Sequence, residues 1–218
     1  MGSQRIRHFF SLPELVFISL MAALNVGFDL LVSPILILLL GHIIAGILIM
    51  VPVNFIFISL TKHLIDKFGA LILYMLVFSV ISIPTTFFGS TPGVYKLLVG
   101  LAVGILLDIV NLIKKPIVLK IILGGLFGAI IWWMSTFLIW STLGYPFVTG
   151  MSNLVNNMIN LSSFISIPIT QINGDFFLFA LICGSLSAIQ CILMTATTYP
   201  LAQAIKKTAI YDKFTSYT

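Results

Sequence analysis

Three ionisable residues, Asp29, His42 and Lys96, stand inside or beside long apolar stretches of the sequence. An ionisable group near the centre of a bilayer costs about 2.5 to 3.5 kcal/mol, so such a group usually faces a cavity, a partner or an interface. A carboxylate suits a cationic or amine-bearing ligand, whereas an ammonium suits a carboxylate or phosphate. If apolar helices bring the three side chains together, they form a polar site in an apolar bundle.

The composition requires such helices. The chain has 218 residues, of which 60% are hydrophobic and 8% are charged, and its mean hydropathy is +1.18. This leaves too little polar surface to cover a water-soluble globule. The 11 basic and 6 acidic residues are too sparse for a nucleic-acid-binding protein. Cys183 and Cys191 share one apolar stretch without a CxxC partner, so we expect two buried thiols, no metal site and no cofactor.

The hydropathy pattern predicts an all-α membrane bundle, because about 20 apolar residues in a helix cross the hydrocarbon core. The first span opens with Ser11 and Glu14 at capping-box spacing. Arg5 and Arg7 before an apolar run also fit a signal peptide, but a capped span followed by five more favours a retained helix. The six predicted spans are Leu12 to Leu31, Ile35 to Leu60, Gly69 to Phe88, Val94 to Ile113, Ile117 to Leu143 and Phe176 to Ala204.

The positions of the cations predict the orientation. Ten of the eleven basic residues flank the spans on one side, and Lys96 alone falls on the other. The positive-inside bias then places both termini in the cytoplasm and requires an even number of spans. We therefore expect one domain over residues 1–218, with short cytoplasmic tails (1–11 and 205–218). The ten are Arg5, Arg7, Lys62, Lys67, Lys114, Lys115, Lys120, Lys206, Lys207 and Lys213.

The long outer connection between spans five and six contains an amphipathic segment. Its asparagines recur with helical spacing, and apolar residues fill the other face. The segment either rests in the outer interface or forms a lid whose amides face a ligand. The asparagines are Asn153, Asn156, Asn157 and Asn160.

Several polar and aromatic residues are candidates for the outer half of the membrane. Asp29 is expected near the outer end of span one with Asn25 one turn below, His42 about two turns down span two, and Lys96 at the start of span four. Each also has a simpler interpretation: Lys96 snorkels to the surface, Asp29 is interfacial, and His42 is a hydrogen-bonded core residue. Trp140 and Tyr145 suit either an aromatic wall or an outer aromatic belt. The candidate binding residues are Asn25, Asp29, His42, Tyr95, Lys96, Trp133, Asn157 and Gln190.

Two stripes of small residues indicate close helix packing. Ser19, Ala23 and Gly27 recur every four residues on span one, and Gly100 and Gly104 form GxxxG on span four. In lipid such stripes bring helices together, either with an external partner or inside the bundle.

Asp108 follows the GxxxG stripe deep in span four. We expect it to form a structural ion pair with Lys114 or Lys115.

The motifs of many enzymes are missing from the sequence. It has no HExxH, GxSxG, GxGD, Walker or kinase motif, so we expect no ATP hydrolysis by this chain. It also lacks the two matching inverted halves usual in a self-sufficient secondary transporter. A small bundle with a polar pocket and no energy source suggests a binding subunit that depends on a partner for power.

This pattern resembles the substrate-binding S component of the energy-coupling factor (ECF) vitamin transporters. The similar segments are Met21-Ala22-Ala23-Leu24-Asn25, Leu64-Ile65-Asp66-Lys67-Phe68-Gly69-Ala70, and Gly93 to Leu101 running on to Asp108. The family stripe is Ala-x-x-x-Ala, and its nearest equivalent here is Ser19, Ala23 and Gly27.

The resemblance implies a non-catalytic six-helix subunit in a prokaryotic cell membrane, which captures a vitamin or precursor near its outer face. It implies partners as well, namely a transmembrane T component and two cytoplasmic ATPases. A thiamine-like or pyrimidine ligand is the expectation that follows for the substrate. Two other functions stay open from the residues: a small intramembrane enzyme using Asp29 or Asp108 with His42, and an accessory membrane subunit without a ligand.

Overall fold

The computed structural model describes residues 10–40, 42–84, 93–113, 116–142 and 176–208, and these ranges hold helices and no strand. Five helical stretches are long and apolar enough to cross a membrane, and α4 is a shorter apolar helix. This architecture is consistent with a multi-pass membrane protein. The helices are α1 (Leu12–Leu40), α2 (His42–Ala45), η1 (Gly46–Met50), α3 (Val51–Leu64), α4 (Ala70–Ser82), α5 (Tyr95–Leu112), α6 (Ile117–Thr142) and α8 (Phe176–Lys206).

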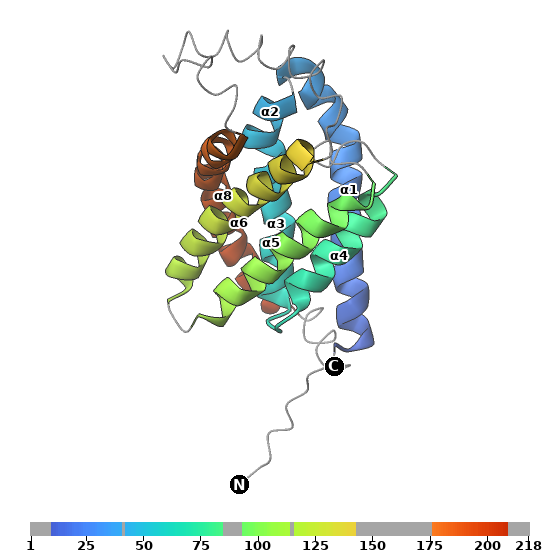
Figure 1. Cartoon of the computed structure of the whole chain (residues 1–218). Coiled ribbons are helices and arrows are strands. Elements are labelled where there is room, and N and C mark those ends of the chain that lie inside the picture. Colours follow the sequence, from blue (N-terminus) through green and yellow to red (C-terminus); the bar gives the residue numbers. More distant parts are fainter. Residues whose placement is uncertain (1–9, 41, 85–92, 114–115, 143–175, 209–218) are drawn as a thin grey trace.

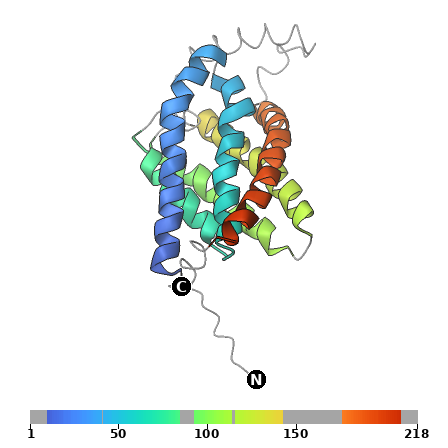
Figure 2. The same cartoon turned by 180° about the vertical axis from the view of Figure 1, so that it is seen from behind.

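The helices form one bundle in which neighbours pack lengthwise (Figure 1). The closest pairs are α6 with α8, α4 with α5 and α3 with α8, while α1 packs mainly on α4. Seen from behind, α3 lies between α1 and α8 (Figure 2). The start of α1 and the end of α8 lie at the same end of the bundle (Figure 1). The end of α3 and the starts of α4 and α6 lie there too (Figure 1). We call this end the lysine end, because those helix ends carry Lys62, Lys67, Lys120 and Lys206, whereas Lys96 is in the first turn of α5, at the opposite end of that helix from Asp108.

The first predicted boundary is wrong. We expected a break before Ile35, but α1 continues through Pro34 to Leu40. A proline inside a helix removes one backbone hydrogen bond, whereas breaking the helix within lipid exposes several unpaired groups, so the continuous helix is the better solution. As a result, His42 begins the second span, instead of lying two turns down it.

The predicted capping box at the start of α1 is confirmed. The backbone N–H of Ser11 donates to the Glu14 carboxylate at 2.8 Å, and the N–H of Glu14 donates to Ser11 Oγ at 3.4 Å. Glu14 also accepts a hydrogen bond from Lys67 Nζ at 2.7 Å, which ties the start of α1 to the segment before α4.

A π-helical turn, η1, interrupts the second span just before Pro52. Its N–H bonds reach one residue further back, as shown by Val51 N–H to the Gly46 carbonyl. A proline ring collides with the carbonyl four residues before it in a regular helix, and the wider turn relieves that collision. The same turn brings Gly46 against Trp133 of α6: a Cβ added at Gly46 would lie 3.0 Å from the indole ring.

The GxxxG stripe of α5 packs inside the bundle, against α4. A Cβ at Gly100 would lie 2.9 Å from the Met75 carbonyl oxygen, and one at Gly104 would lie 2.9 Å from Ile72 Cα. The external partner considered for this stripe is therefore replaced by α4. On α1, by contrast, nothing lies within 4 Å of a Cβ added at Gly27.

We expect Gly104→Ala to destabilise the protein by about 1 to 3 kcal/mol, because the added methyl group forces α4 and α5 apart. The matched substitution Gly27→Ala should be neutral or stabilising by up to about 1 kcal/mol, since alanine is the better helix residue and has open space there. Unfolding of both purified variants in detergent measures the difference. Equal destabilisation by the two substitutions would contradict the packing described for α5.

The bundle buries polar side chains beside its hydrophobic core, and much of its outer surface is apolar. On α1, Leu31 and Leu38 are 76% and 86% exposed, whereas Asn25 and Asp29 are 1% and 7% exposed. Apolar side chains exposed over whole helices are expected where lipid covers them. The buried polar residues therefore need partners within the protein or in a bound molecule.

Candidate functional site

Four buried polar side chains meet in the middle of the bundle, and we call them the mid-bundle cluster: Asn25 and Asp29 of α1, Asn54 of α3 and Tyr74 of α4. Asn25 Nδ2 donates to the Tyr74 hydroxyl at 2.8 Å. The side chain of Asn54 provides a hydrogen bond to the Asp29 carboxylate. The mid-bundle cluster therefore draws its side chains from three helices, and all four side chains are buried inside the bundle.

The mid-bundle cluster has oxygen acceptors to spare. Within the described part of the chain, Oδ1 of Asn25, Asp29 and Asn54 are all buried without a hydrogen-bond partner. Ser33 Oγ, one turn beyond Asp29, is in the same state. Each unsatisfied buried polar atom costs about 1 to 3 kcal/mol, and most such atoms in proteins have a partner. The arrangement is suited to a bound molecule that donates hydrogen bonds.

The depth of this cluster differs from the prediction for Asp29. We expected Asp29 near the outer end of its span, but about 16 Å of α1 follow it, at 1.5 Å per residue. The difference follows directly from the continuation of α1 through Pro34. His42 was expected at a similar depth, and its side chain lies outside the described residues.

Asn54 and Tyr74 are missing from the sequence-based set of candidates. That set included amides elsewhere in the chain but passed over Asn54, an amide between Pro52 and Phe55 in an otherwise apolar stretch. An amide is also costly to bury without a partner, so its position inside a span was a usable signal.

Lys96 makes its contact with α4. Its side chain is fully buried, and Nζ donates to the Ser82 carbonyl oxygen at 2.5 Å. A lysine near the last turn of a helix satisfies a carbonyl that the helix leaves open. Complete burial does not fit the interpretation that Lys96 snorkels to the surface. The neighbouring Tyr95 is 38% exposed.

Trp133 connects three helical segments. Its Nε1 donates to Ser187 Oγ of α8 at 2.8 Å, and its ring packs on Phe137 and close to Gly46. This buried position makes Trp133 a packing residue between α6, α8 and η1.

Gln190 of α8 is half-buried, and its Oε1 has no partner among the described residues. The hydrogen bonds of the mid-bundle cluster do not include Gln190. Three other candidates lie outside the described part of the chain. They are the side chain of Trp140, the residue Tyr145, and Asn157 with the rest of the segment from Asn153 to Asn160.

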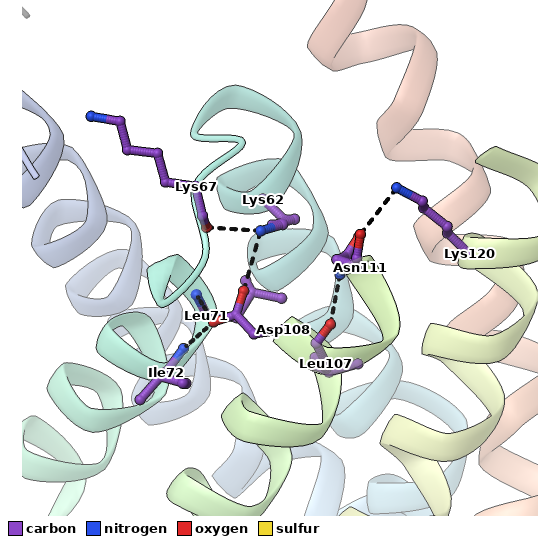
Figure 3. A network of polar contacts seen from close by, with 8 residues as sticks. All are labelled: Lys62, Lys67, Leu71, Ile72, Leu107, Asp108, Asn111 and Lys120. Atoms are coloured by element: carbon purple, nitrogen blue, oxygen red, sulfur yellow. Dashed lines mark hydrogen bonds and ion pairs between the residues drawn. The ribbon is translucent and has the colours of Figure 1, made fainter. Parts of the chain in front are cut away.

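Asp108 is the centre of a second polar network, at the lysine end (Figure 3). Asp108 Oδ1 pairs with Lys62 Nζ at 3.2 Å, and Oδ2 accepts the backbone N–H groups of Leu71 and Ile72, each at 3.1 Å. Lys62 also donates to the Lys67 carbonyl at 2.8 Å. The ion pair was expected, but its partner is Lys62 of α3.

The lysines predicted to pair with Asp108, Lys114 and Lys115, lie outside the described residues. Because both oxygens of Asp108 already accept hydrogen bonds, the carboxylate serves as a cap for α4 and a link to α3. That leaves it poorly placed for the acid or base role considered with His42, which requires direct contact or one bridging water. Among the described residues, no group of three metal-ligating acidic, histidine or cysteine side chains lies together.

The small-residue stripe of α1 faces outward. Ser19 and Ala23 are exposed and Gly27 is half-buried, while the opposite face, with Ile18, Ala22 and Asn25, packs into the bundle. The stripe is therefore available to another helix in the membrane, in contrast to the glycines of α5.

Comparison with protein-family models, curated proteins and solved structures finds no match to this chain. The functional argument therefore depends on the residues and their geometry.

Proposed function

We propose that this chain is the membrane-embedded substrate-binding subunit of an ECF-type importer, and that it captures a small water-soluble vitamin or precursor. The observation that carries the proposal is the mid-bundle cluster, in which a carboxylate and two amides keep three buried oxygens without partners in the described part of the chain. A protein that only needed to pack its helices would gain stability from apolar residues at these positions. A ligand that fills the acceptors explains why polar residues are there.

The chemistry of the cluster favours a cationic or N–H-rich ligand. Its open atoms are acceptors, and Asp29 contributes a carboxyl group, whereas Lys96 is hydrogen-bonded to the end of α4. In a water-poor site each of these contacts is stronger than in water. A thiamine-like molecule or a pyrimidine with amino groups has the matching donors.

The proposal includes partners, because the sequence has no motif for ATP hydrolysis. A T component and two ATPases are the partners that the family resemblance implies. The outward-facing stripe of Ser19, Ala23 and Gly27 supports a docking position on α1, since an approaching helix would meet small side chains there.

Native mass spectrometry of the full chain, purified without added ligand, tests the function. We expect a small organic molecule to be retained, and added thiamine or its amino-pyrimidine moiety to exchange with it or to occupy empty protein. The Asp29→Asn variant serves as the comparison, because it should lose the retained molecule. A wild-type protein that carries nothing and that binds none of a panel of cationic and pyrimidine nutrients would rule out the proposed capture.

We expect Ala23→Trp to leave ligand binding unchanged and to abolish uptake in cells that contain the transporter partners. Ala23 is exposed, so a large side chain disturbs an approaching helix and not the bundle. The matched control is Leu24→Trp, which places the same ring on a residue that is 52% exposed but lies 100° around α1. Uptake should survive in the control. Loss of binding in Ala23→Trp would instead assign the stripe to internal packing.

A further inference from the structure

The lysine end of the bundle contains a cavity of about 40 Å³, separate from the mid-bundle cluster. It is lined by the second halves of α3 and α5, the beginnings of α4 and α6, and Thr195 of α8. At about 10 to 15 Å³ per water, this volume holds roughly three water molecules, or one small oxyanion. Most of its wall is apolar, and the polar residues that line it are Ser59, Lys62, His63, Asn111, Lys120 and Thr195.

This cavity leaves several polar groups wholly or partly open, and a hydroxyl and an ammonium group among them can donate hydrogen bonds. Thr195 is 9% exposed, and its Oγ1 has no partner among the described residues. His63 Nε2, which is also buried, is in the same state. Lys120 Nζ donates to the Asn111 carbonyl at 3.1 Å (Figure 3), which uses one of the three N–H bonds of an ammonium group.

The charges around the cavity favour an anion. Lys62 is balanced by its ion pair with Asp108, whereas the described contact of Lys120 is with a neutral carbonyl. His63 lies within the electrostatic influence of Lys206 and Asp66, which carry opposite charges. Among the described residues around the cavity there are thus three lysines, Lys62, Lys120 and Lys206, and two carboxylates, Asp66 and Asp108. Ile117 and Ile121, in the first turns of α6, line the cavity as well, and the start of a helix carries partial positive charge.

We propose that this cavity binds one phosphate group, with Lys120 as its charged contact and Thr195 and His63 as hydrogen-bonding groups. The phosphate belongs either to the headgroup of an anionic lipid or to free inorganic phosphate, because both present the same oxygens. The site shares no residue with the mid-bundle cluster, so its failure would leave the proposed function untouched.

The full chain in lipid nanodiscs allows both sources to be tested. One arm compares nanodiscs of phosphatidylcholine with nanodiscs that contain phosphatidylglycerol, and counts the lipids retained after gentle release by native mass spectrometry. The other arm adds inorganic phosphate to phosphatidylcholine nanodiscs and measures the shift in thermal unfolding against chloride at equal ionic strength. Retained phosphatidylglycerol assigns the site to a lipid, and a shift with phosphate alone assigns it to the free ion. If neither occurs, the proposal is wrong.

Variants localise the effect. Thr195→Val, which removes only a hydroxyl group, should weaken the binding detected in the positive arm about tenfold, the loss expected for one hydrogen bond to a charged group. Lys120→Gln should weaken it further, and Lys120→Arg should retain it. Lys207→Gln is the matched control, because Lys207 is exposed near the same end and does not line the cavity. Equal losses in Lys207→Gln and Lys120→Gln would show general attraction to charge and overturn the site.

Discussion

Replacing Asp29 by asparagine should weaken ligand binding by about 30-fold to 5,000-fold. The substitution keeps the size of the side chain and one carbonyl oxygen, and removes the carboxyl group that would carry the charge opposite a cationic ligand. Losing one partner of a buried, hydrogen-bonded charge pair costs about 2 to 5 kcal/mol, and each 1.4 kcal/mol corresponds to a tenfold change in affinity. Isothermal titration with thiamine, or with the molecule that co-purifies with the wild type, measures the loss.

The structure offers a matched control on the same helix. Glu14 is the other acidic residue of α1, and its carboxylate is engaged with Ser11 and Lys67 at the lysine end. Glu14→Gln should therefore bind the ligand as the wild type does. Asn54→Leu should give an intermediate loss, because Asn54 holds the Asp29 carboxylate and adds its own open oxygen. Unchanged affinity in Asp29→Asn would place the ligand elsewhere in the bundle.

The sequence predicted the helices well, because the features that define them are local. Hydropathy over about 20 residues located five helical stretches long enough to cross a membrane, whereas the third predicted span, Gly69 to Phe88, contains only the shorter helix α4. Three residues of spacing were enough for the box of Ser11 and Glu14. The error at Pro34 came from treating a proline as a boundary. Within lipid, one missing N–H is a smaller defect than a broken helix, so the local rule failed there.

The contacts of the candidate site were less predictable, because they depend on which helices pack together. Asn25 and Asp29 were identified from α1 alone, but their partners Tyr74 and Asn54 lie on other helices. A pair separated by 49 residues, such as Asn25 and Tyr74, leaves no spacing pattern to detect. The sequence could have marked both as polar groups in apolar spans, although it could not have paired them.

The same limit explains the partner of Asp108. Lys114 and Lys115 are near it in sequence, whereas Lys62 is separated by 46 residues and comes close only because α3, α4 and α5 meet at the lysine end. Proximity in sequence therefore gives no indication of Lys62, whose contact depends on how the three helices pack.

We expect Asp108→Ala to destabilise the protein by about 3 to 5 kcal/mol. The substitution leaves the Lys62 ammonium buried without its counter-charge, which is a costly state. It also removes the acceptor for Leu71 and Ile72 N–H in the first turn of α4, where a lost cap typically costs about 1 kcal/mol. Equilibrium unfolding in mixed detergent micelles, followed by tryptophan fluorescence, measures the change.

Two further variants separate the buried charge from the cap. Replacing both partners, Asp108→Leu with Lys62→Met, should recover most of the stability, because an apolar pair of similar volume avoids the desolvation of two charges. What it does not recover is the contribution of the cap on α4. Lys67→Met, which breaks the more exposed ion pair with Glu14, should cost only about 0 to 1 kcal/mol. If Asp108→Ala proved no more damaging than Lys67→Met, then neither the buried pair nor the cap would hold α3, α4 and α5 together, and the lysine end would owe its structure to apolar packing alone.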